Sequence, residues 1–269
     1  MNTKTTVHFA DNYLLQPPNP ITCNIIGAGG TGSQLLTAMA RMSHSLIALG
    51  HPGLWVQLFD DDIVTEANLG RQLFASSEKG LYKSVVLINR VNRFFGTNWK
   101  AITNLYDHKN HEVIAKYGAA NMIISCVDTL TARFEIAKII TLLEKENRFH
   151  QNKMLYWMDF GNGKETGQVI LSTIGKIKQP ASKKFQTAND LPFITKQFKE
   201  LLLTSEKKDT TPSCSLADAL TKQDLFINST LVNMGASLLW NLFREGMIEH
   251  RGFFINLKSF HARPLKVKG

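Results

Sequence analysis

The sequence predicts an α/β fold in which a mostly parallel sheet carries helices on both faces and has an antiparallel edge. Short apolar runs typical of buried strands alternate with stretches whose apolar residues recur at helical spacing. Late in this alternation, a glycine turn at residues 161–163 joins two apolar runs, which indicates a hairpin. Because parallel strands need crossover helices whereas a hairpin joins antiparallel strands, the two patterns together predict this fold class.

The first elements expected are a strand, a helix and a second strand. Ile21–Ile26 is an apolar run that follows a cluster of prolines, and the helix behind it repeats apolar residues up to Leu46. The continuous apolar run Leu54–Phe59 predicts a strand that is buried on both faces. Residues 85–95 are then expected to form a helix, and residues 99–105 a short strand.

The middle of the chain continues the alternation up to the hairpin. A buried strand at residues 121–128 precedes a helix that Thr129 and Thr131 are placed to cap. The other elements expected here are a short helix at 113–117, the capped helix at 132–146, and the hairpin strands at 154–160 and 166–174.

The regular pattern breaks at a lysine-rich crossover segment over residues 175–212. An apolar patch at residues 191–203 gives this segment one candidate helix. Crossing segments of this length are usually functional or mobile. A long helix at residues 225–243 and a final strand at residues 253–260 complete the expected fold.

The composition indicates a chain with a substantial core. Of 269 residues, 43% are hydrophobic, and no stretch approaches the roughly 18 to 20 apolar residues that a membrane helix needs. We expect a cytoplasmic protein with one main domain over residues 21–269 behind an N-terminal arm over residues 1–20. The formal net charge is +9. Because lysines are spread along the chain without a recognition motif, neither nucleic acid nor a membrane is expected as a partner.

A glycine-rich turn connects the first strand to its helix. The sequence I-I-G-A-G-G-T-G-S contains Gly27, Gly29 and Gly32 in the pattern G-x-G-x-x-G, with Gly30 as a further small residue. Glycines at these positions allow a sharp turn and let backbone N–H groups approach a phosphate at a helix N-terminus. On its own, the motif fits any nucleotide or dinucleotide site.

Acidic residues follow two of the expected strands. Asp60 is at the end of the second strand, where Rossmann-like folds place an acid that accepts hydrogen bonds from ribose hydroxyls. Asp62 completes a D-x-D pattern, with a capping role as its open alternative, and Asp128 ends a later strand. These acids are expected at the carboxyl edge of one Rossmann-like sheet.

An ordered set of motifs resembles the ThiF/MoeB/HesA superfamily, the adenylyltransferase domain shared with ubiquitin-activating enzymes. The set is G-x-G-G-x-G, D-x-D, N-x-x-R-Q at residues 68–72, G-x-x-K at residues 80–83 and a strand-end Asp, within residues 21–171. The segment E-A-N-L-G-R-Q also resembles PRTRC-type ThiF proteins of bacterial mobile elements. The resemblance implies ATP-dependent adenylation of the C-terminal carboxylate of a small ubiquitin-like protein ending in glycine.

The resemblance also implies roles for particular side chains. Arg71, through its guanidinium fork, and Lys83, as a point charge, would offset the negative charge that moves onto the leaving pyrophosphate. Asn68 resembles the phosphate-contacting asparagine of the family, and Gln72 is its neighbour in the same loop. Asp128 resembles the carboxylate that holds Mg²⁺, an ion that usually takes only one or two protein carboxylates.

A cysteine segment carries a second resemblance. The sequence T-P-S-C-S-L around Cys214 is similar to the proline-x-Cys-Thr/Ser segment of ubiquitin-activating enzymes, whose thiolate attacks the acyl-adenylate and keeps the carrier as a thioester. An inert cysteine is the open alternative. Cys23 and Cys126 are expected to be core residues. Since no C-x-x-C pair is present, structural zinc is not expected.

Three functions remain open from the sequence. The first is an ATP- and Mg²⁺-dependent adenylyltransferase, expected as a homodimer, that serves a conjugating or sulfur-transfer partner and guides the carrier tail with residues 175–212. The others are a non-catalytic partner or scaffold subunit and an NAD-dependent oxidoreductase. Bacterial relatives commonly supply an N-terminal arginine to the other subunit's ATP, but the first arginine here is Arg41, within the first helix, and Lys4 is the only lysine upstream.

Overall fold

A computed structural model describes residues 4–70, 72–146, 153–205 and 223–268. The helices are α1 (Asn12–Leu15), α2 (Gly30–Ala48), α3 (Lys83–Phe95), α4 (His111–Tyr117), α5 (Leu130–Glu146), α6 (Ile194–Gln197), α7 (Lys199–Ser205) and α9 (Ile227–Glu245). The strands are β1 (Thr6–Phe9), β2 (Ile21–Ile26), β3 (Leu54–Phe59), β4 (Lys100–Ile102), β5 (Met122–Ser125), β6 (Tyr156–Asn162), β7 (Thr166–Thr173), β8 (Gln186–Thr187), β9 (Met247–Ile248), β10 (His250–Asn256) and β11 (His261–Lys266).

The central sheet has eight strands in the order β11-β10-β7-β6-β5-β2-β3-β4. Strands β4, β3, β2, β5 and β6 pair in parallel, whereas the pairs β6–β7, β7–β10 and β10–β11 are antiparallel. This arrangement confirms the fold class predicted from the sequence. The chain leaves β2 for β3 and β4 on one side, then crosses to β5 on the other. The topological switch point of the sheet therefore lies between β2 and β5, where α/β proteins bind ligands beyond the strands' carboxyl ends.

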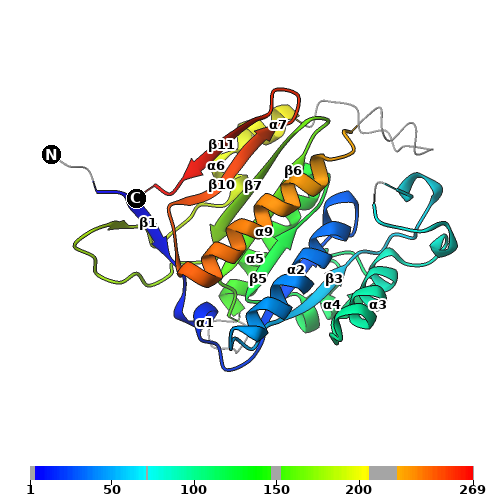
Figure 1. Ribbon diagram of the computed structural model, residues 1–269, viewed down its shortest axis with the longest axis horizontal. Helices are drawn as coiled ribbons and strands as arrows, with labels where there is room; N and C mark the ends of the chain where they lie inside the picture. Colours follow the sequence, from blue (N-terminus) through cyan, green and yellow to red (C-terminus); the bar gives the residue numbers. More distant parts are fainter. Residues whose placement is uncertain (1–3, 71, 147–152, 206–222, 269) are drawn as a thin grey trace.

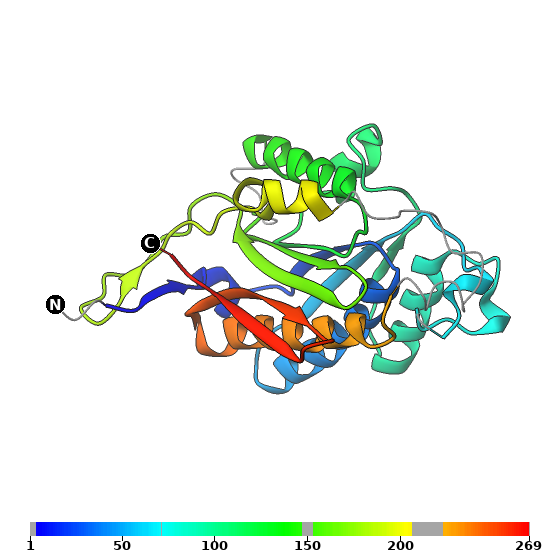
Figure 2. The same cartoon turned by 90° about the horizontal axis from the view of Figure 1, so that it is seen from above.

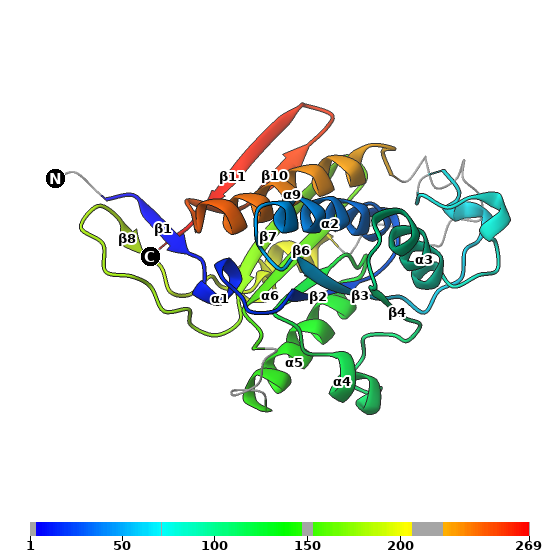
Figure 3. The same cartoon turned by 60° about the horizontal axis from the view of Figure 1, so that its bottom comes forward.

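Helices cover both faces of the sheet. Figures 1 and 3 show α2, α3 and α9 on one face, and Figure 2 shows α5, α6 and α7 together on the other. The two faces have separate hydrophobic clusters, and alternate residues of β2 serve them: Cys23 and Ile25 join the α2 face, while Ile26 joins the α5 face. Asn24, also on the α5 face, is buried but satisfied, because its Nδ2 donates to the carbonyls of Tyr117 and Gly118.

Several elements differ from the sequence prediction, and among them β4 and β5 are shorter than the strands expected at residues 99–105 and 121–128. The N-terminal arm contains secondary structure that was not predicted: β1 pairs in parallel with β8 and antiparallel with β9, and α1 follows it. The apolar patch at residues 191–203 forms α6 and α7, which Phe198 separates, rather than one helix. The bounds predicted for the final strand, residues 253–260, were wrong. Strand β10 ends at Asn256, and the chain then turns back into β11.

A buried histidine fixes the arm to the sheet. His8 is fully buried, and its Nδ1 lies 2.8 Å from the carbonyl of Ala188. Since a carbonyl can only accept, Nδ1 carries the proton, and Nε2 accepts from the hydroxyl of Tyr156 at 3.0 Å. That hydroxyl in turn accepts from the backbone N–H of Asp11 at 3.1 Å. The neutral imidazole is therefore fully hydrogen-bonded.

Acidification is expected to weaken this attachment. Burial lowers the pKa of His8 below its usual range, so the unfolded chain binds this proton at a higher pH than the folded chain does. The free energy of unfolding should therefore fall as the pH drops below about 6.5. Urea unfolding between about pH 7.5 and about pH 5 measures this dependence. His8→Gln, which cannot be protonated, should show a shallower loss; equal pH dependence in both proteins would contradict the prediction.

Candidate active site

The candidate site lies where the carboxyl ends of β2, β3 and β5 meet at the switch point. The loop after each strand contributes one part: the glycine turn after β2, the acidic residues after β3, and the segment 126–129 after β5. Backbone contacts hold these loops together. The N–H of Gly27 donates to the carbonyl of Phe59, and the N–H of Cys126 donates to the carbonyl of Ile26, both at 2.8 Å.

Each glycine of the turn has its own steric reason. Gly27 has a φ of +96°, and a Cβ there would lie 2.8 Å from the carbonyl oxygen of Cys126. A Cβ on Gly32 would lie 1.8 Å from the carbonyl oxygen of Gly27, and one on Gly30 would lie 2.5 Å from Nδ2 of Asn228. A Cβ on Gly29, in contrast, would have no atom within 4 Å. Gly29 therefore faces open space, where a ligand can approach the backbone.

Asp60 joins the glycine turn to the acidic loop. Its Oδ2 accepts from the backbone N–H of Ala28 at 2.6 Å, and its Oδ1 accepts from the N–H of Asp62 at 3.1 Å. Burial raises the pKa of Asp60 to about 6, while the Ala28 N–H and the charge of Lys83 act in the opposite direction. A carboxylate oxygen has more than one acceptor site, so Asp60 can hold the turn and still accept from a ligand hydroxyl.

Lys83 and Asp62 form an ion pair beside Asp60. Lys83 is the first residue of α3, and its side chain is only 8% exposed, whereas that of Asp62 is 67% exposed. The Lys83 Nζ lies 2.7 Å from Asp62 Oδ2, and the backbone N–H of Lys83 donates to the carbonyl of Asp62. The hydroxyl of Ser84 donates to the carbonyl of Asp60 at 2.9 Å. The D-x-D and G-x-x-K motifs thus meet in space.

The N-x-x-R-Q motif lies on the loop between these two motifs. Asn68 ends a short 3₁₀ helix, η1 (Glu66–Asn68), and its Oδ1 accepts from the N–H and the hydroxyl of Thr65, which closes a capping box. Gln72 is buried, and its Oε1 has no hydrogen-bond partner in the described structure. Its amide oxygen is therefore a buried hydrogen-bond acceptor without a partner. Arg71 lies outside the described residues.

Asp128 fits the role of a single magnesium carboxylate. It is exposed, between the end of β5 and the start of α5, and no described residue forms a hydrogen bond or an ion pair with its side chain. It does not group with two other His, Cys, Asp or Glu side chains of the described structure into a preformed metal cluster. Mg²⁺ held there would take its other oxygen ligands from phosphates and water, as this ion commonly does.

A buried ion pair that the sequence motifs did not reveal holds the Asp128 loop. Arg133 on α5 and Asp159 on β6 are both buried, with Nε 3.1 Å from Oδ1. The other guanidinium nitrogens of Arg133 donate to the carbonyls of Val127, Thr129 and Phe160. The loop on either side of Asp128 is therefore fixed by one arginine.

Asn228 on α9 was also missed by sequence reasoning. This residue is 1% exposed, and its Oδ1 accepts from the hydroxyl of Thr31 at 2.9 Å and from Nδ2 of Asn162 at 2.7 Å. It links the first turn of α2 to the end of β6 and packs against Gly30. The one feature of the sequence that could have identified Asn228 is a polar residue at the apolar start of a predicted helix.

The predicted cysteine and capping roles have mixed outcomes. Cys23 is fully buried in the core, as expected, whereas Cys126 is only partly buried and packs against the edge of the core. Burial raises the pKa of the Cys23 thiol far above its usual range. Cys214 lies outside the described residues. Thr129 does cap α5, since its hydroxyl accepts from the N–H of Ala132 at 3.2 Å. Thr131 was wrong as a cap, because α5 begins at Leu130 and places it inside the first turn.

The glycine turn at the switch point and the strand-end Asp60 define a Rossmann-like α/β protein. The particular family follows from the sequence, because the ThiF family model matches residues 19–221. The chain belongs to the ThiF family and has its adenylyltransferase-like fold. Comparison with curated protein sequences gives no significant match. In the described part of the chain, no helix has both the length and the hydropathy to cross a membrane.

Solved structures share this fold at low sequence identity. PaaA matches with a TM-score of 0.58 and 14% identity, over 94% of this chain and 65% of its own. Escherichia coli MccB with MccA matches with a TM-score of 0.57 and 15% identity, over 95% of this chain and 66% of its own. E. coli MccB with ATP gives a TM-score of 0.52 at 14% identity, over 94% and 64%. The chain thus spans about two thirds of these proteins' length, slightly less in each case.

Proposed function

We propose that this protein binds ATP at the carboxyl edge of β2, β3 and β5 and adenylates the C-terminal carboxylate of a polypeptide. The observation that carries the proposal is the meeting of the open glycine turn, Asp60 and Lys83 at the switch point. Family membership and the E. coli MccB complexes with ATP and with MccA support this chemistry. We propose that residues 21–269 act as one catalytic domain behind the arm.

The proposed reaction is a displacement at the α-phosphorus of ATP. A carboxylate oxygen of the polypeptide attacks the α-phosphorus, a new P–O bond forms, and the bond to the bridging oxygen of pyrophosphate breaks. Negative charge moves onto the pyrophosphate, where Lys83, Arg71, Asn68 and Gln72 would offset it without transferring a proton. Mg²⁺ bound at Asp128 would neutralise part of the triphosphate charge.

The narrower assignments are also proposals. We propose that the polypeptide is a small ubiquitin-like protein ending in glycine, that Cys214 takes over its acyl group as a thioester, and that the product passes to a conjugating or sulfur-transfer partner. A cytoplasmic homodimer is the proposed working form. In thioester formation, the Cys214 sulfur bonds to the carbonyl carbon and AMP leaves.

Nucleotide titration tests the proposal directly. Isothermal titration calorimetry with MgATP and with NAD should show binding of ATP alone. Asp60→Asn should weaken ATP binding about tenfold, because the amide cannot accept from the ribose while it also serves Ala28 and Asp62. Lowering the pH below about 6 should weaken binding in the same direction, since the Asp60 carboxylate becomes protonated.

The matched control for this titration is Asp61→Asn. Asp61 is the exposed neighbour of Asp60 in the same run of acids, so its replacement makes the same change in charge and should leave ATP affinity unchanged. Pyrophosphate exchange with candidate polypeptides then measures adenylation. Binding of NAD without ATP would favour the oxidoreductase, and ATP binding without exchange for any polypeptide would favour the scaffold subunit.

A further inference from the structure

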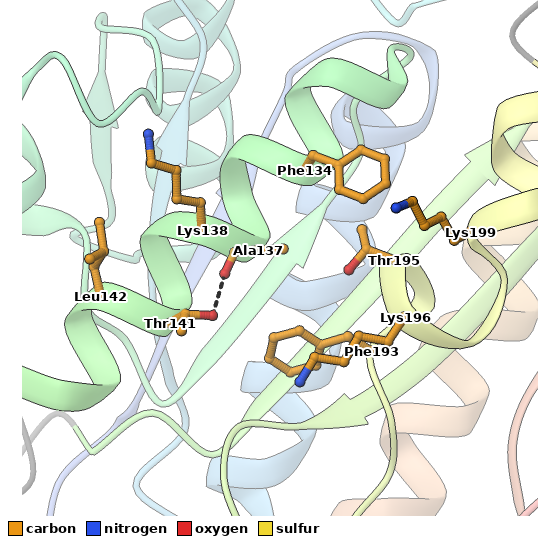
Figure 4. Close-up of a pocket in the computed structure, with 9 residues that line it drawn as sticks. All are labelled: Phe134, Ala137, Lys138, Thr141, Leu142, Phe193, Thr195, Lys196 and Lys199. Carbon is orange, nitrogen blue, oxygen red and sulfur yellow. Dashed lines mark hydrogen bonds between the residues drawn. The ribbon is translucent and has the colours of Figure 1, made fainter.

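A groove lies between α5 and the α6–α7 segment (Figure 4). These helices lie on the sheet face opposite α2 and α9 (Figure 2). Its volume is about 620 Å³, and its lining is mostly apolar. Figure 4 shows Phe134 and Leu142 of α5 on one side and Phe193, just before α6, on the other. Leu142 is 45% exposed despite its size. The groove therefore offers apolar surface that a partner side chain can cover.

The wall formed by residues 192–197 is rigidly held. Phe193 packs edge-on against the buried Trp157, with ring centroids 5.0 Å apart. The buried Arg251 of β10 donates to the carbonyl of Pro192 at 3.0 Å and to Oε1 of Gln197. Because these contacts exist before any partner arrives, binding would require little ordering of this wall.

Three lysines are among the residues that line the groove. Lys138 comes from α5, Lys196 from α6 and Lys199 from α7, and all three are exposed. No carboxylate of the described chain forms an ion pair with any of them. The Nζ of Lys196 lies 5.3 Å from the ring centroid of Phe193, at the boundary between charge and apolar surface. Such a surface is complementary to an acidic segment that carries an apolar side chain.

The groove begins close to the proposed site of adenylation. It starts on α5 at Phe134, four residues after Leu130, the first residue of the helix, which corresponds to about 6 Å along the helix axis, and Asp128 comes two residues before that helix. From Phe134 to Leu142 it extends about 12 Å farther. An extended polypeptide covers about 3.3 Å per residue. A substrate with its last carboxylate beside Asp128 would therefore reach the groove within a few residues.

We propose that this groove docks an acidic segment of the polypeptide substrate, with an apolar side chain between Phe134 and Phe193 and carboxylates at Lys138, Lys196 and Lys199. This proposal rests on the proposed function, which supplies a polypeptide as the substrate. Within the crossover segment, it assigns contact with the substrate to residues 193–199. A second copy of this chain fits less well. In a two-fold interface the same surface would face itself, so lysines would oppose lysines.

Fluorescence anisotropy with a labelled synthetic peptide tests the docking without nucleotide. The probe alternates glutamate with leucine and ends in a free Gly-Gly carboxylate; a second probe has lysine in place of glutamate. The acidic probe should bind the full chain, more weakly as salt rises, and the basic probe should not. The combined variant Lys138→Glu, Lys196→Glu and Lys199→Glu should weaken binding about tenfold or more.

The matched control reverses three exposed lysines away from the groove: Lys183→Glu, Lys258→Glu and Lys266→Glu. It has the same net charge as the groove variant and should retain binding. Equal loss in both variants would overturn the proposal, because general charge would explain it. Leu142→Asn should also weaken binding several-fold, since the leucine side chain is exposed and its replacement disturbs little of the core.

Two further measurements distinguish this proposal from the proposed function and from dimerisation through the groove. If MgATP binds in calorimetry but the acidic probe does not bind, docking is overturned while the proposed function stands. If the probe binds at the groove but ATP does not bind, the proposed function fails and the docking surface remains. Sedimentation velocity on the groove variant reports the alternative occupant: a dimer that becomes a monomer would assign the groove to a second copy and overturn the proposal.

Discussion

Replacing Asp159 by alanine is expected to lower the free energy of unfolding by about 3–5 kcal/mol, because it leaves the charge of Arg133 buried without its partner. Arg133 and Asp159 are 6% and 1% exposed, so water cannot replace the lost carboxylate. Asp159 Oδ1 also accepts from the hydroxyl of Ser125 at 2.6 Å, and that hydroxyl accepts from Trp157 Nε1 at 2.8 Å. Urea unfolding measures the loss.

A double substitution tests whether the uncompensated charge is the cause. Asp159→Ala combined with Arg133→Met removes both charges and keeps most of the side-chain volume on α5, so it should recover part of the lost stability. A double variant no more stable than Asp159→Ala would contradict this account. Even where stability returns, ATP-dependent activity should remain low, because Arg133 no longer fixes the loop that carries Asp128.

Replacing Gly32 by alanine is expected to cost about 2–3 kcal/mol of stability and to remove nucleotide binding. The new Cβ would lie 1.8 Å from the carbonyl oxygen of Gly27, and the atom it meets belongs to backbone rather than to a flexible side chain. Gly27 cannot easily retreat, since its N–H is bonded to the carbonyl of Phe59. Thermal unfolding and ATP calorimetry measure the two effects.

Gly29→Ala is the matched comparison, three residues away in the same turn. Its φ of −73° suits alanine, and a Cβ there would meet no atom within 4 Å. We expect wild-type stability but weaker ATP binding, because the methyl group would occupy the space through which a phosphate approaches the backbone. Wild-type stability for Gly32→Ala, or unchanged ATP affinity for Gly29→Ala, would show that the turn does not work in this way.

The sequence predicted two of the parallel strands with their exact bounds, whereas the strands expected at residues 99–105 and 121–128 are shorter in the structure, as β4 and β5. Strands β2 and β3 have the expected bounds, Ile21–Ile26 and Leu54–Phe59, because each largely apolar run follows proline or glycine and stops before glycine or aspartate. The hairpin β10–β11 was missed because its turn, residues 257–260, contains no proline, glycine or aspartate. It uses Asn256, whose Oδ1 accepts from the N–H of Ser259, and Phe260, which has a φ of +52° and is 93% exposed.

Some residues of the candidate site could likewise be predicted from the sequence, and others could not. Asp60 and Lys83 could be found because an ordered motif carries them within a short span of the chain. Asn228 and Asp159 could not be placed, because each acts through partners on distant elements and a single polar residue in an apolar run does not identify its partner. The ion pair between Lys83 and Asp62 was also unforeseen, although both residues belong to predicted motifs.

The position of β1 has a consequence for how the chain is synthesised. Thr6 pairs with Gln186 and His8 with Ile248, so both neighbours of this strand are made long after it leaves the ribosome. At about 5–20 residues per second, the interval is on the order of 10–50 s. Strand β1 must stay without these partners throughout, and its docking can be completed only after residue 248 has been made.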